Sequence, residues 1–232
     1  MLEAIVLAGG LGTRLRPVVE ELPKCMAPVA GRPFISYVLD YFQKKGVSRF
    51  ILALGYKHEA IQSYVNNHYP VGHFRYSIEK APLGTGGALR LACSQASSDS
   101  VLVLNGDTFF GVDPVALASF HNEHEADCTL ALKPMKNFDR YGVVSLRADQ
   151  RIEKFQEKKF YQSGLINGGV YMVKRASLLD ELLPEKFSFE KDYLEAFYDS
   201  KKMFGMVQDR YFIDIGIPTD YEIAQTELVL NI

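Results

Sequence analysis

The residues that could do chemistry begin near the start of the chain, where glycines and two cations lie close together. They follow an apolar run over residues 4–8 in this order: Gly9, Gly10, Gly12, Arg14 and Lys24. Glycines let main-chain N–H groups approach an anion closely, so such a segment can hold phosphate. The spacing G-G-x-G differs from the dinucleotide motif G-x-G-x-x-G, and no Gly-Lys-Ser/Thr follows as in a P-loop. The segment is therefore either a phosphate-binding loop of another type or a simple tight turn, which a glycine cluster by itself forms at least as often.

Two aspartates occur where apolar runs end or are interrupted. Asp107 follows the apolar run 101–104, where it is either a turn residue or a ligand. Asp214 stands inside the apolar run 212–215, and a buried charge there needs a partner because an unpaired one is costly. Hard oxygen ligands suit magnesium. From spacing alone the turn residue is the favoured interpretation of Asp107, but Asp107 and Asp214 together with substrate phosphates would make an ordinary Mg²⁺ site.

The composition bounds the class of protein that carries these residues. The chain has 232 residues, 47% hydrophobic and 23% charged, which suits a globular α/β protein. Its net charge of −2 provides no basic field for nucleic acid. The three cysteines form no C-x-x-C pair and are expected to be reduced thiols. No apolar run is long enough for a signal peptide or a membrane span, so a soluble, cytoplasmic protein without a membrane partner is expected.

The hydrophobic periodicity predicts strands and helices that alternate in the first part of the chain. Strands are expected over residues 4–8, 49–54, 74–79, 101–104 and 128–133, and helices over 34–45 and 58–67, after the glycine-rich turn 82–87 through Leu91, and from Asp113-Pro114 onward. Further strands are expected over 142–146, 151–155, 168–173 and 211–215, and helices over 176–183, 190–199 and 220–230. Such alternation predicts a mainly parallel, three-layer sheet. Ligands bind at the carboxyl ends of parallel strands, so the glycine loops and both aspartates could converge on one crevice.

Several motifs occur together in an order that resembles the sugar-phosphate nucleotidyltransferases. They are Leu7-Ala8-Gly9-Gly10-Leu11-Gly12-Thr13-Arg14-Leu15, Pro23-Lys24, Pro82-Leu83-Gly84-Thr85-Gly86-Gly87, Asn105-Gly106-Asp107, Tyr141-Gly142-Val143-Val144, Glu157-Lys158, Asn167-Gly168-Gly169 and Asp214-Ile215-Gly216-x-Pro218. The resemblance covers nearly the whole chain. It implies a single-domain, Rossmann-like α/β fold of three layers with a mixed, mainly parallel central sheet, of the nucleotide-diphospho-sugar transferase type. Within residues 1–232, the nucleotide-binding half is expected over about 1–134 and the sugar-phosphate-binding half over about 135–232.

The reaction that the resemblance implies is the joining of a sugar 1-phosphate to a nucleoside triphosphate, with release of pyrophosphate. A sugar phosphate oxygen attacks the α-phosphorus in line. A phosphate monoester is mostly dianionic at neutral pH, since its second pKa is about 6, so this nucleophile needs no general base. Catalysis then consists of alignment and of neutralising anions that repel each other. The alternatives are a catalytically inactive, nucleotide-binding regulatory relative and a dinucleotide-dependent oxidoreductase, which the loop spacing disfavours.

The resemblance also implies a role for particular residues. The expected catalytic residues are Arg14, Lys24 and Asp107. The expected nucleotide-binding residues are Leu7, Ala8, Gly9, Gly10, Gly12, Thr13, Arg14, Lys24, Glu79, Gly84 and Thr85. The expected sugar-phosphate-binding residues are Gly142, Glu157, Lys158, Asn167 and Asp192, and the metal ligands are Asp107 and Asp214. For Lys158 the alternative is a solvated charge run, and for Asp192 an exposed helix residue without a role.

Glu79 bears on which base is bound. A carboxylate only accepts hydrogen bonds, so it suits the two adjacent donors of guanine better than the single N3–H of uracil. Such a bidentate contact is worth about 1–3 kcal/mol of discrimination. The alternative is that Glu79 pairs with Lys80 or with solvent. GTP is therefore the favoured donor, and UTP is left open.

The segments 23–29 and 187–192 resemble those of bacterial guanylyltransferases that use D-glycero-α-D-manno-heptose 1-phosphate to make GDP-heptose for surface polysaccharide. A mannose 1-phosphate or an N-acetylmuramate 1-phosphate is left open, as is a homodimer. His121 and His124 lie three residues apart, and they are interpreted as a solvated helix face because no third metal ligand adjoins them.

Overall fold

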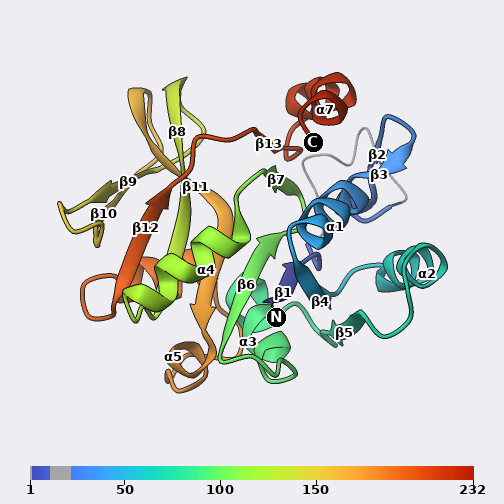
Figure 1. Cartoon of the computed structure of the whole chain (residues 1–232), viewed down its shortest axis with the longest axis horizontal. Helices are drawn as coiled ribbons and strands as arrows, with labels where there is room; N and C mark the ends of the chain where they lie inside the picture. Colours follow the sequence, from blue (N-terminus) through green and yellow to red (C-terminus); the bar gives the residue numbers. More distant parts are fainter. Residues whose placement is uncertain (1, 11–21) are drawn as a thin grey trace.

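The structure, a computed structural model, describes residues 2–10 and 22–232 (Figure 1). Three of the expected nucleotide-binding residues, Gly12, Thr13 and Arg14, lie outside these ranges. Among the described residues, the central sheet has nine strands, with the order β10-β9-β11-β6-β1-β4-β5 and with β8 and β12 joined through β11. Their bounds are β1 Leu2–Leu7, β4 Val47–Leu54, β5 Phe74–Ile78, β6 Ser100–Asn105, β8 Cys128–Phe138, β9 Val143–Leu146, β10 Ile152–Gln156, β11 Tyr161–Lys174 and β12 Met203–Val207.

The sheet is mixed. Strands β6, β1, β4 and β5 pair in parallel, and β12 pairs in parallel with β8, so six of the nine strands take part in parallel pairs. Strand β11 runs antiparallel to β6, β8 and β9, and β10 runs antiparallel to β9. Two small ribbons stand apart from this sheet: β2 (Pro28–Val29) with β3 (Arg32–Pro33), and β7 (Thr108–Phe110) with β13 (Phe212–Asp214).

Helices cover both faces of the sheet. Their bounds are α1 Phe34–Lys44, α2 His58–His68, α3 Gly84–Cys93, α4 Pro114–Glu123, α5 Arg175–Leu179, α6 Glu195–Phe197 and α7 Pro218–Leu230, together with the 3₁₀-helix η1 Lys24–Met26 and the π-helix η2 Phe189–Leu194. Helix α4 starts as its sequence predicts, because the Asp113 carboxylate accepts hydrogen bonds from the N–H groups of Val115 and Ala116.

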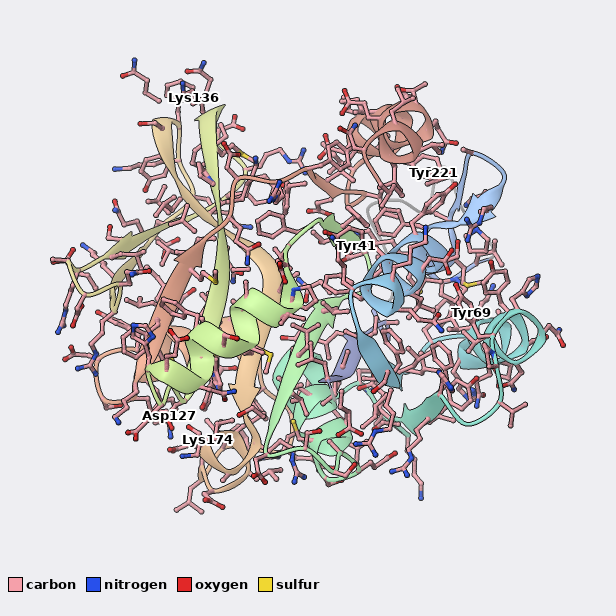
Figure 2. The ribbon with its side chains drawn as sticks, in the orientation of Figure 1. Tyr41, Tyr69, Asp127, Lys136, Lys174 and Tyr221 are labelled. Atoms are coloured by element: carbon pink, nitrogen blue, oxygen red, sulfur yellow. The ribbon has the colours of Figure 1, made fainter. Side chains whose placement is uncertain are left out.

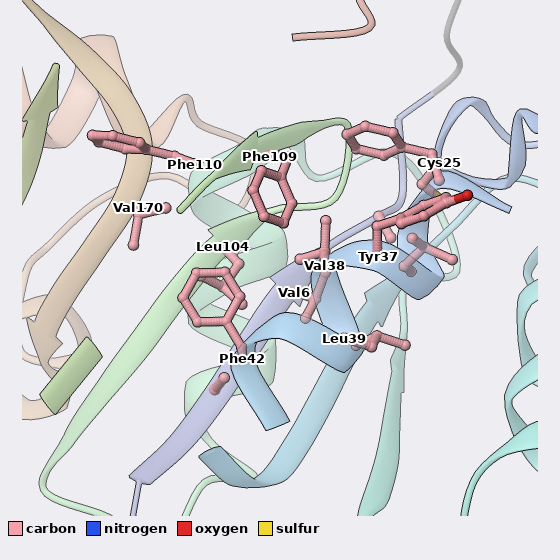
Figure 3. Close-up of a cluster of buried hydrophobic side chains, with 14 of the residues drawn as sticks. Val6, Cys25, Tyr37, Val38, Leu39, Phe42, Leu104, Phe109, Phe110 and Val170 are labelled. Atoms are coloured by element: carbon pink, nitrogen blue, oxygen red, sulfur yellow. The ribbon is translucent and has the colours of Figure 1, made fainter. Parts of the chain in front are cut away.

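Alternate residues of the inner strands β1, β4, β6 and β11 enter two separate cores, which makes the fold a three-layer one. Val6 and Leu104 pack with α1 on one face, where Val38 and Phe42 meet them (Figure 3). Ile5, one residue from Val6, packs with α3 and η2 on the opposite face. This alternation is the two-residue period of a strand buried on both sides. The expectation of a three-layer α/β fold with a mixed, mainly parallel sheet is confirmed.

Tyrosine hydroxyl groups fasten the outer layer to the loops (Figure 2). The Tyr221 hydroxyl of α7 donates to the carbonyl of Pro28 at 2.5 Å, and the Tyr41 hydroxyl of α1 donates to the carbonyl of Gly111 at 2.8 Å. These bonds fix α7 and α1 beside the loops that carry the candidate site. Among the described residues, no helix is long and apolar enough to cross a membrane.

The structure corrects the bounds of two expected helices and adds strands that were not expected. The helix expected over 176–183 ends at Leu179. Pro184 disfavours helical backbone at the residue before it, and the carbonyl groups of Leu183 and Pro184 accept hydrogen bonds from the Arg90 guanidinium instead of from helical N–H groups. The helix expected over 190–199 is divided into η2 and α6. Strand β12 and the short strand β7 were not expected at all; each is held by pairing with a strand from a distant part of the chain.

The interpretation of the face with His121 and His124 as solvated is wrong for His121, whereas His124 is partly exposed. His121 is buried, and its ring nitrogens lie 3.1 Å from the Ser100 hydroxyl and 3.0 Å from the Thr129 hydroxyl. His124 stacks on Phe120. Periodicity within α4 could not show this, because His121 is buried by contacts with β6 and β8, and the packing of a helix on a sheet is not a local signal of the helix sequence.

Candidate active site

A cavity of about 720 Å³ opens at the carboxyl ends of β1, β4 and β6. Nine of the expected residues line it: Leu7, Ala8, Gly9, Gly10, Lys24, Glu79, Gly84, Thr85 and Asp107. Further lining residues that the sequence did not single out for this role include Gly55, Tyr56, Lys80 and Ala81. Gly55 directly follows β4, just as Gly9 lies shortly after β1. A glycine at the end of a strand could therefore have identified Gly55 as a cavity residue from the sequence. The ends of β1, β4 and β6 meet at one crevice as expected, and Asp107 lines it, whereas Asp214 is not among the lining residues of this cavity.

Close contact between neighbouring strand ends forms the floor of this cavity. The N–H of Ala8 donates to the carbonyl of Ala53, and the N–H of Gly106 donates to the carbonyl of Leu7, both at 2.9 Å. A Cβ atom on Gly106 would lie 2.8 Å from the Leu7 carbonyl oxygen. Glycine at this position therefore lets the turn after β6 close against β1.

Lys24 lies between the two aspartates. Its Nζ is 2.5 Å from Oδ2 of Asp107 and 3.6 Å from Oδ1 of Asp214. The aspartates are 107 residues apart in sequence, and the β7–β13 ribbon brings them together by pairing Asp214 with Thr108. The N–H of Gly216 donates to Oδ1 of Asp214 at 2.7 Å, which fixes the orientation of this carboxylate.

The two aspartates lie close enough for the charge of one to act on the other. Burial raises the pKa of Asp214, and the negative charge of Asp107 raises it further, while Lys24 acts in the opposite direction. The two carboxylates are hard oxygen donors, which fits a divalent cation such as Mg²⁺. Within residues 2–10 and 22–232, no group of three or more His, Cys, Asp or Glu side chains forms a metal cage. The donor set therefore fits a cation that takes its remaining ligands from water and substrate.

Glu79 lies over the glycines at the ends of β1 and β4. Its Oε2 accepts a hydrogen bond from the N–H of Leu83 at 3.0 Å. A Cβ atom on Gly55 would lie 2.4 Å from Oε1 of Glu79, and one on Gly9 would lie 3.2 Å from it. A pair between Glu79 and Lys80, the expected alternative, is not among the ion pairs of the described part of the chain.

The second glycine turn packs against the segment that precedes η2. Gly84 has a φ of +73°, and a Cβ atom there would lie 2.5 Å from the carbonyl oxygen of Phe187. Thr85 donates from its hydroxyl to Oε2 of Glu190 at 2.8 Å and accepts from the N–H of Phe189 at 2.9 Å. Although Gly84 and Thr85 both line the cavity, their closest contacts hold α3 against η2.

The five residues expected to bind the sugar phosphate do not line this cavity. Asn167 lies in the bulge of β11, where its amide donates to the Tyr171 hydroxyl at 2.9 Å. Glu157 and Lys158 are exposed after β10, and a Cβ atom on Gly142 would lie 2.5 Å from the Gln156 carbonyl oxygen.

Asp192 has a structural contact, since its carboxylate accepts from the N–H of Ser188 at 2.7 Å at the start of η2. This contact is compatible with the alternative considered for it, a helix residue without a role in binding. All five assignments to the sugar phosphate stay predictions.

Arg140 is a charged residue near the site that the sequence did not single out. Its Nη1 lies 2.5 Å from Oδ2 of Asp220, and its Nη2 lies 4.0 Å from Oδ2 of Asp214. It lines a second cavity of about 310 Å³, and Asp214 forms part of the wall of that cavity. Asp214 thus has Lys24 near one oxygen and Arg140 near the other. No sequence signal pointed to Arg140, because its relation to Asp214 arises from the fold.

Comparisons with known proteins agree with this geometry. A D-glycero-alpha-D-manno-heptose 1-phosphate guanylyltransferase of Aneurinibacillus thermoaerophilus is 51% identical over 227 residues, which is 98% of this chain and 98% of that protein. The enzyme of the same name from Campylobacter jejuni is 43% identical over 95% of this chain and 97% of its own.

The crystal structure of HddC from Yersinia pseudotuberculosis complexed with GMP-PN matches with a TM-score of 0.88 at 35% identity, covering 98% of this chain and 99% of HddC. Mannose-1-phosphate guanyltransferases are more distant, as the one from Schizosaccharomyces pombe shows at 34% identity over 62% of its length. The family model described as nucleotidyl transferase matches residues 3–229. The fold, the crevice and these matches together place the chain in the nucleotidyl transferase family.

Proposed function

We propose that this chain transfers GMP from GTP to D-glycero-α-D-manno-heptose 1-phosphate, giving GDP-heptose and pyrophosphate. The observation that carries the proposal is the arrangement of the 720 Å³ cavity, with Lys24 and Asp107 in its lining together with Glu79. Relatives that are 51% and 43% identical over nearly their full length are guanylyltransferases for this heptose 1-phosphate. The mannose 1-phosphate alternative is weaker, because the relatives that use mannose are less similar and longer.

The reaction needs no base from the protein. An oxygen of the dianionic sugar phosphate forms a bond to the α-phosphorus of GTP, and the bond from that phosphorus to the β-phosphate oxygen breaks. The electron pair leaves with pyrophosphate. Lys24 neutralises charge near the α-phosphate, and Arg14 is assigned to the pyrophosphate on the resemblance alone. What the protein supplies is alignment and charge.

Asp107 and Asp214 are proposed to hold the divalent cation, and we propose Mg²⁺ because both donors are carboxylates. When bound, such a cation neutralises the charge that develops on the phosphate oxygens. The protein itself brings the two carboxylates to the same place and keeps both in reach of Lys24.

Glu79 is proposed to accept hydrogen bonds from N1–H and N2–H₂ of guanine. Its carboxylate already lies against Gly9 and Gly55, and side chains at those positions would displace it. Gly142, Glu157, Lys158, Asn167 and Asp192 are proposed for the sugar phosphate. A cytoplasmic location and a homodimer stay predictions.

The test is a matrix of GTP, UTP, ATP and CTP against several sugar 1-phosphates, with released pyrophosphate as the readout. GTP with the heptose 1-phosphate is expected to give the highest kcat/KM. Preference for mannose 1-phosphate would replace the sugar assignment, and tight GTP binding without turnover on any sugar phosphate would indicate an inactive relative.

The first mutational prediction concerns Asp107. Asp107→Ala is expected to lower kcat by roughly a hundredfold or more, because several kcal/mol of charge stabilisation in the transition state are lost. Asp180→Ala, which removes an exposed carboxylate at the end of α5, is the matched control and should leave turnover unchanged. Unchanged turnover in Asp107→Ala would overturn the metal assignment.

A further inference from the structure

We infer that Lys24 holds the place of the divalent cation between Asp107 and Asp214 until nucleotide binds, so that this site takes up metal poorly when nucleotide is absent. The inference rests on the proposed function, since it concerns the same two carboxylates. It assigns to Lys24 a second role, which is to control when a cation can enter.

The position of Lys24 is fixed by its surroundings. It begins η1, directly after Pro23, and the next two residues, Cys25 and Met26, are buried in the core. Its side chain is only 12% exposed. Its ammonium group lies 2.5 Å from one Asp107 oxygen and 3.6 Å from one Asp214 oxygen, so it contacts a donor atom of each proposed ligand.

Glycine at position 216 leaves room for this arrangement. A Cβ atom there would lie 2.8 Å from Oδ1 of Asp214 and 3.2 Å from Nζ of Lys24. The same oxygen of Asp214 also accepts the hydrogen bond from the N–H of Gly216. The backbone therefore fixes the orientation of the Asp214 carboxylate, and the absence of a side chain at position 216 leaves space for the ammonium group beside it.

The charges explain why Lys24 occupies this place. Two carboxylates that share a site repel each other, and Asp214 has lost much of its water. One ammonium group offsets part of that repulsion. A divalent cation would offset more, but it must displace Lys24, whose positive charge would then lie in a largely buried place without its partners.

Bound nucleotide phosphates give Lys24 another negatively charged partner. Lys24 also lines the cavity, so the oxygens of a phosphate bound there can accept hydrogen bonds from its ammonium group. The two carboxylates are then released by Lys24 at the moment when phosphate oxygens become available to the cation. Affinity for phosphate and affinity for the cation are thereby coupled, and by linkage each increases the other.

The experiment titrates Mn²⁺ into nucleotide-free protein, with the free Mn²⁺ measured by electron paramagnetic resonance. Lys24→Gln and Lys24→Met, which remove the charge, are expected to bind Mn²⁺ about tenfold more tightly than the wild type. Lys24→Arg keeps the charge and should not show the gain. Circular dichroism shows whether each variant is folded. Two uncharged variants are used because, if one of them fails to fold, the other still tests the inference.

The double variant Lys24→Gln/Asp107→Asn locates the bound ion, because it should lose the gain. Equal or weaker Mn²⁺ binding in both uncharged variants would overturn the inference, as would a gain that persists in the double variant. The outcome is separate from that of the proposed function. Absence of pyrophosphate release on every substrate would remove the function while the Mn²⁺ result still decides the role of Lys24.

Discussion

Single residues define the candidate site through contacts that join distant parts of the chain. Lys24 and Asp107 are 83 residues apart in sequence, yet they form the shortest ion pair of the cavity. Glu79 lies among bare backbone at the ends of β1 and β4. At this scale the chemistry is set by side-chain type, and the position of each side chain is set by the glycines around it.

The prediction for Glu79 concerns base selection. Glu79→Gln replaces an oxygen acceptor with an amide donor, so one of the two hydrogen bonds to guanine is lost. The ratio of kcat/KM for GTP to that for UTP is expected to fall roughly tenfold to a hundredfold. Glu123→Gln, the same chemical change on the exposed face of α4, is the control and should keep the ratio. An unchanged ratio in Glu79→Gln would show that the base is read elsewhere.

At the scale of elements, the contact between α3 and η2 closes one wall of the cavity. The glycine turn at the start of α3 accepts this contact because the N–H of Gly86 donates to the carbonyl of Phe187 at 3.0 Å. Thr85 and Glu190 add a hydrogen bond across it. A short π-helix at this position is a feature often found at functional sites.

Gly84→Ala tests that contact. Its φ of +73° disfavours a side chain, and the added Cβ would meet the Phe187 carbonyl oxygen at 2.5 Å. We expect the free energy of unfolding to fall by about 2–4 kcal/mol in urea titrations. Gly72→Ala is the matched control, since Gly72 has a similar φ of +93° but nothing lies within 4 Å of its Cβ position. Equal losses in both variants would mean that backbone strain alone accounts for the effect.

At the scale of the whole molecule, a buried histidine joins the outer helix α4 to the central sheet. His121 bridges Ser100 at the start of β6 and Thr129 of β8. Burial lowers the pKa of His121 to about 4, from an ordinary value near 6.5. Between about pH 4 and pH 6.5, the ring is therefore neutral in the folded protein and protonated in the unfolded chain.

Stability is therefore expected to depend on pH. Below about pH 6.5 the unfolded state takes up a proton that the folded state refuses, so the free energy of unfolding falls as the pH decreases toward about 4. The largest loss from this residue is roughly 3 kcal/mol. Urea unfolding between about pH 7 and pH 4.5 measures it. His121→Gln should flatten this dependence, whereas His68→Gln on the exposed end of α2 should not; a wild-type slope in His121→Gln would contradict the assignment.

The sequence by itself determined the layers of the fold and the residue types of the site. Apolar runs such as that of β1 and the capped start of α4 are local signals, because burial and hydrogen bonding within one element decide them. The division of function between about residues 1–134 and 135–232, and the roles of Gly12, Thr13 and Arg14, stay predictions from motif order.

Only the tertiary structure decided which of these residues meet. The strand β12 and the ribbon of β7 and β13 depend on pairing between segments far apart in sequence, and no local periodicity reports such pairing. The ribbon brings Asp107 and Asp214 together, and the fold places Lys24 between them and Arg140 on the other side of Asp214. The chemistry of each side chain follows from its residue type, whereas the distance between two residues far apart in sequence depends on the folded chain.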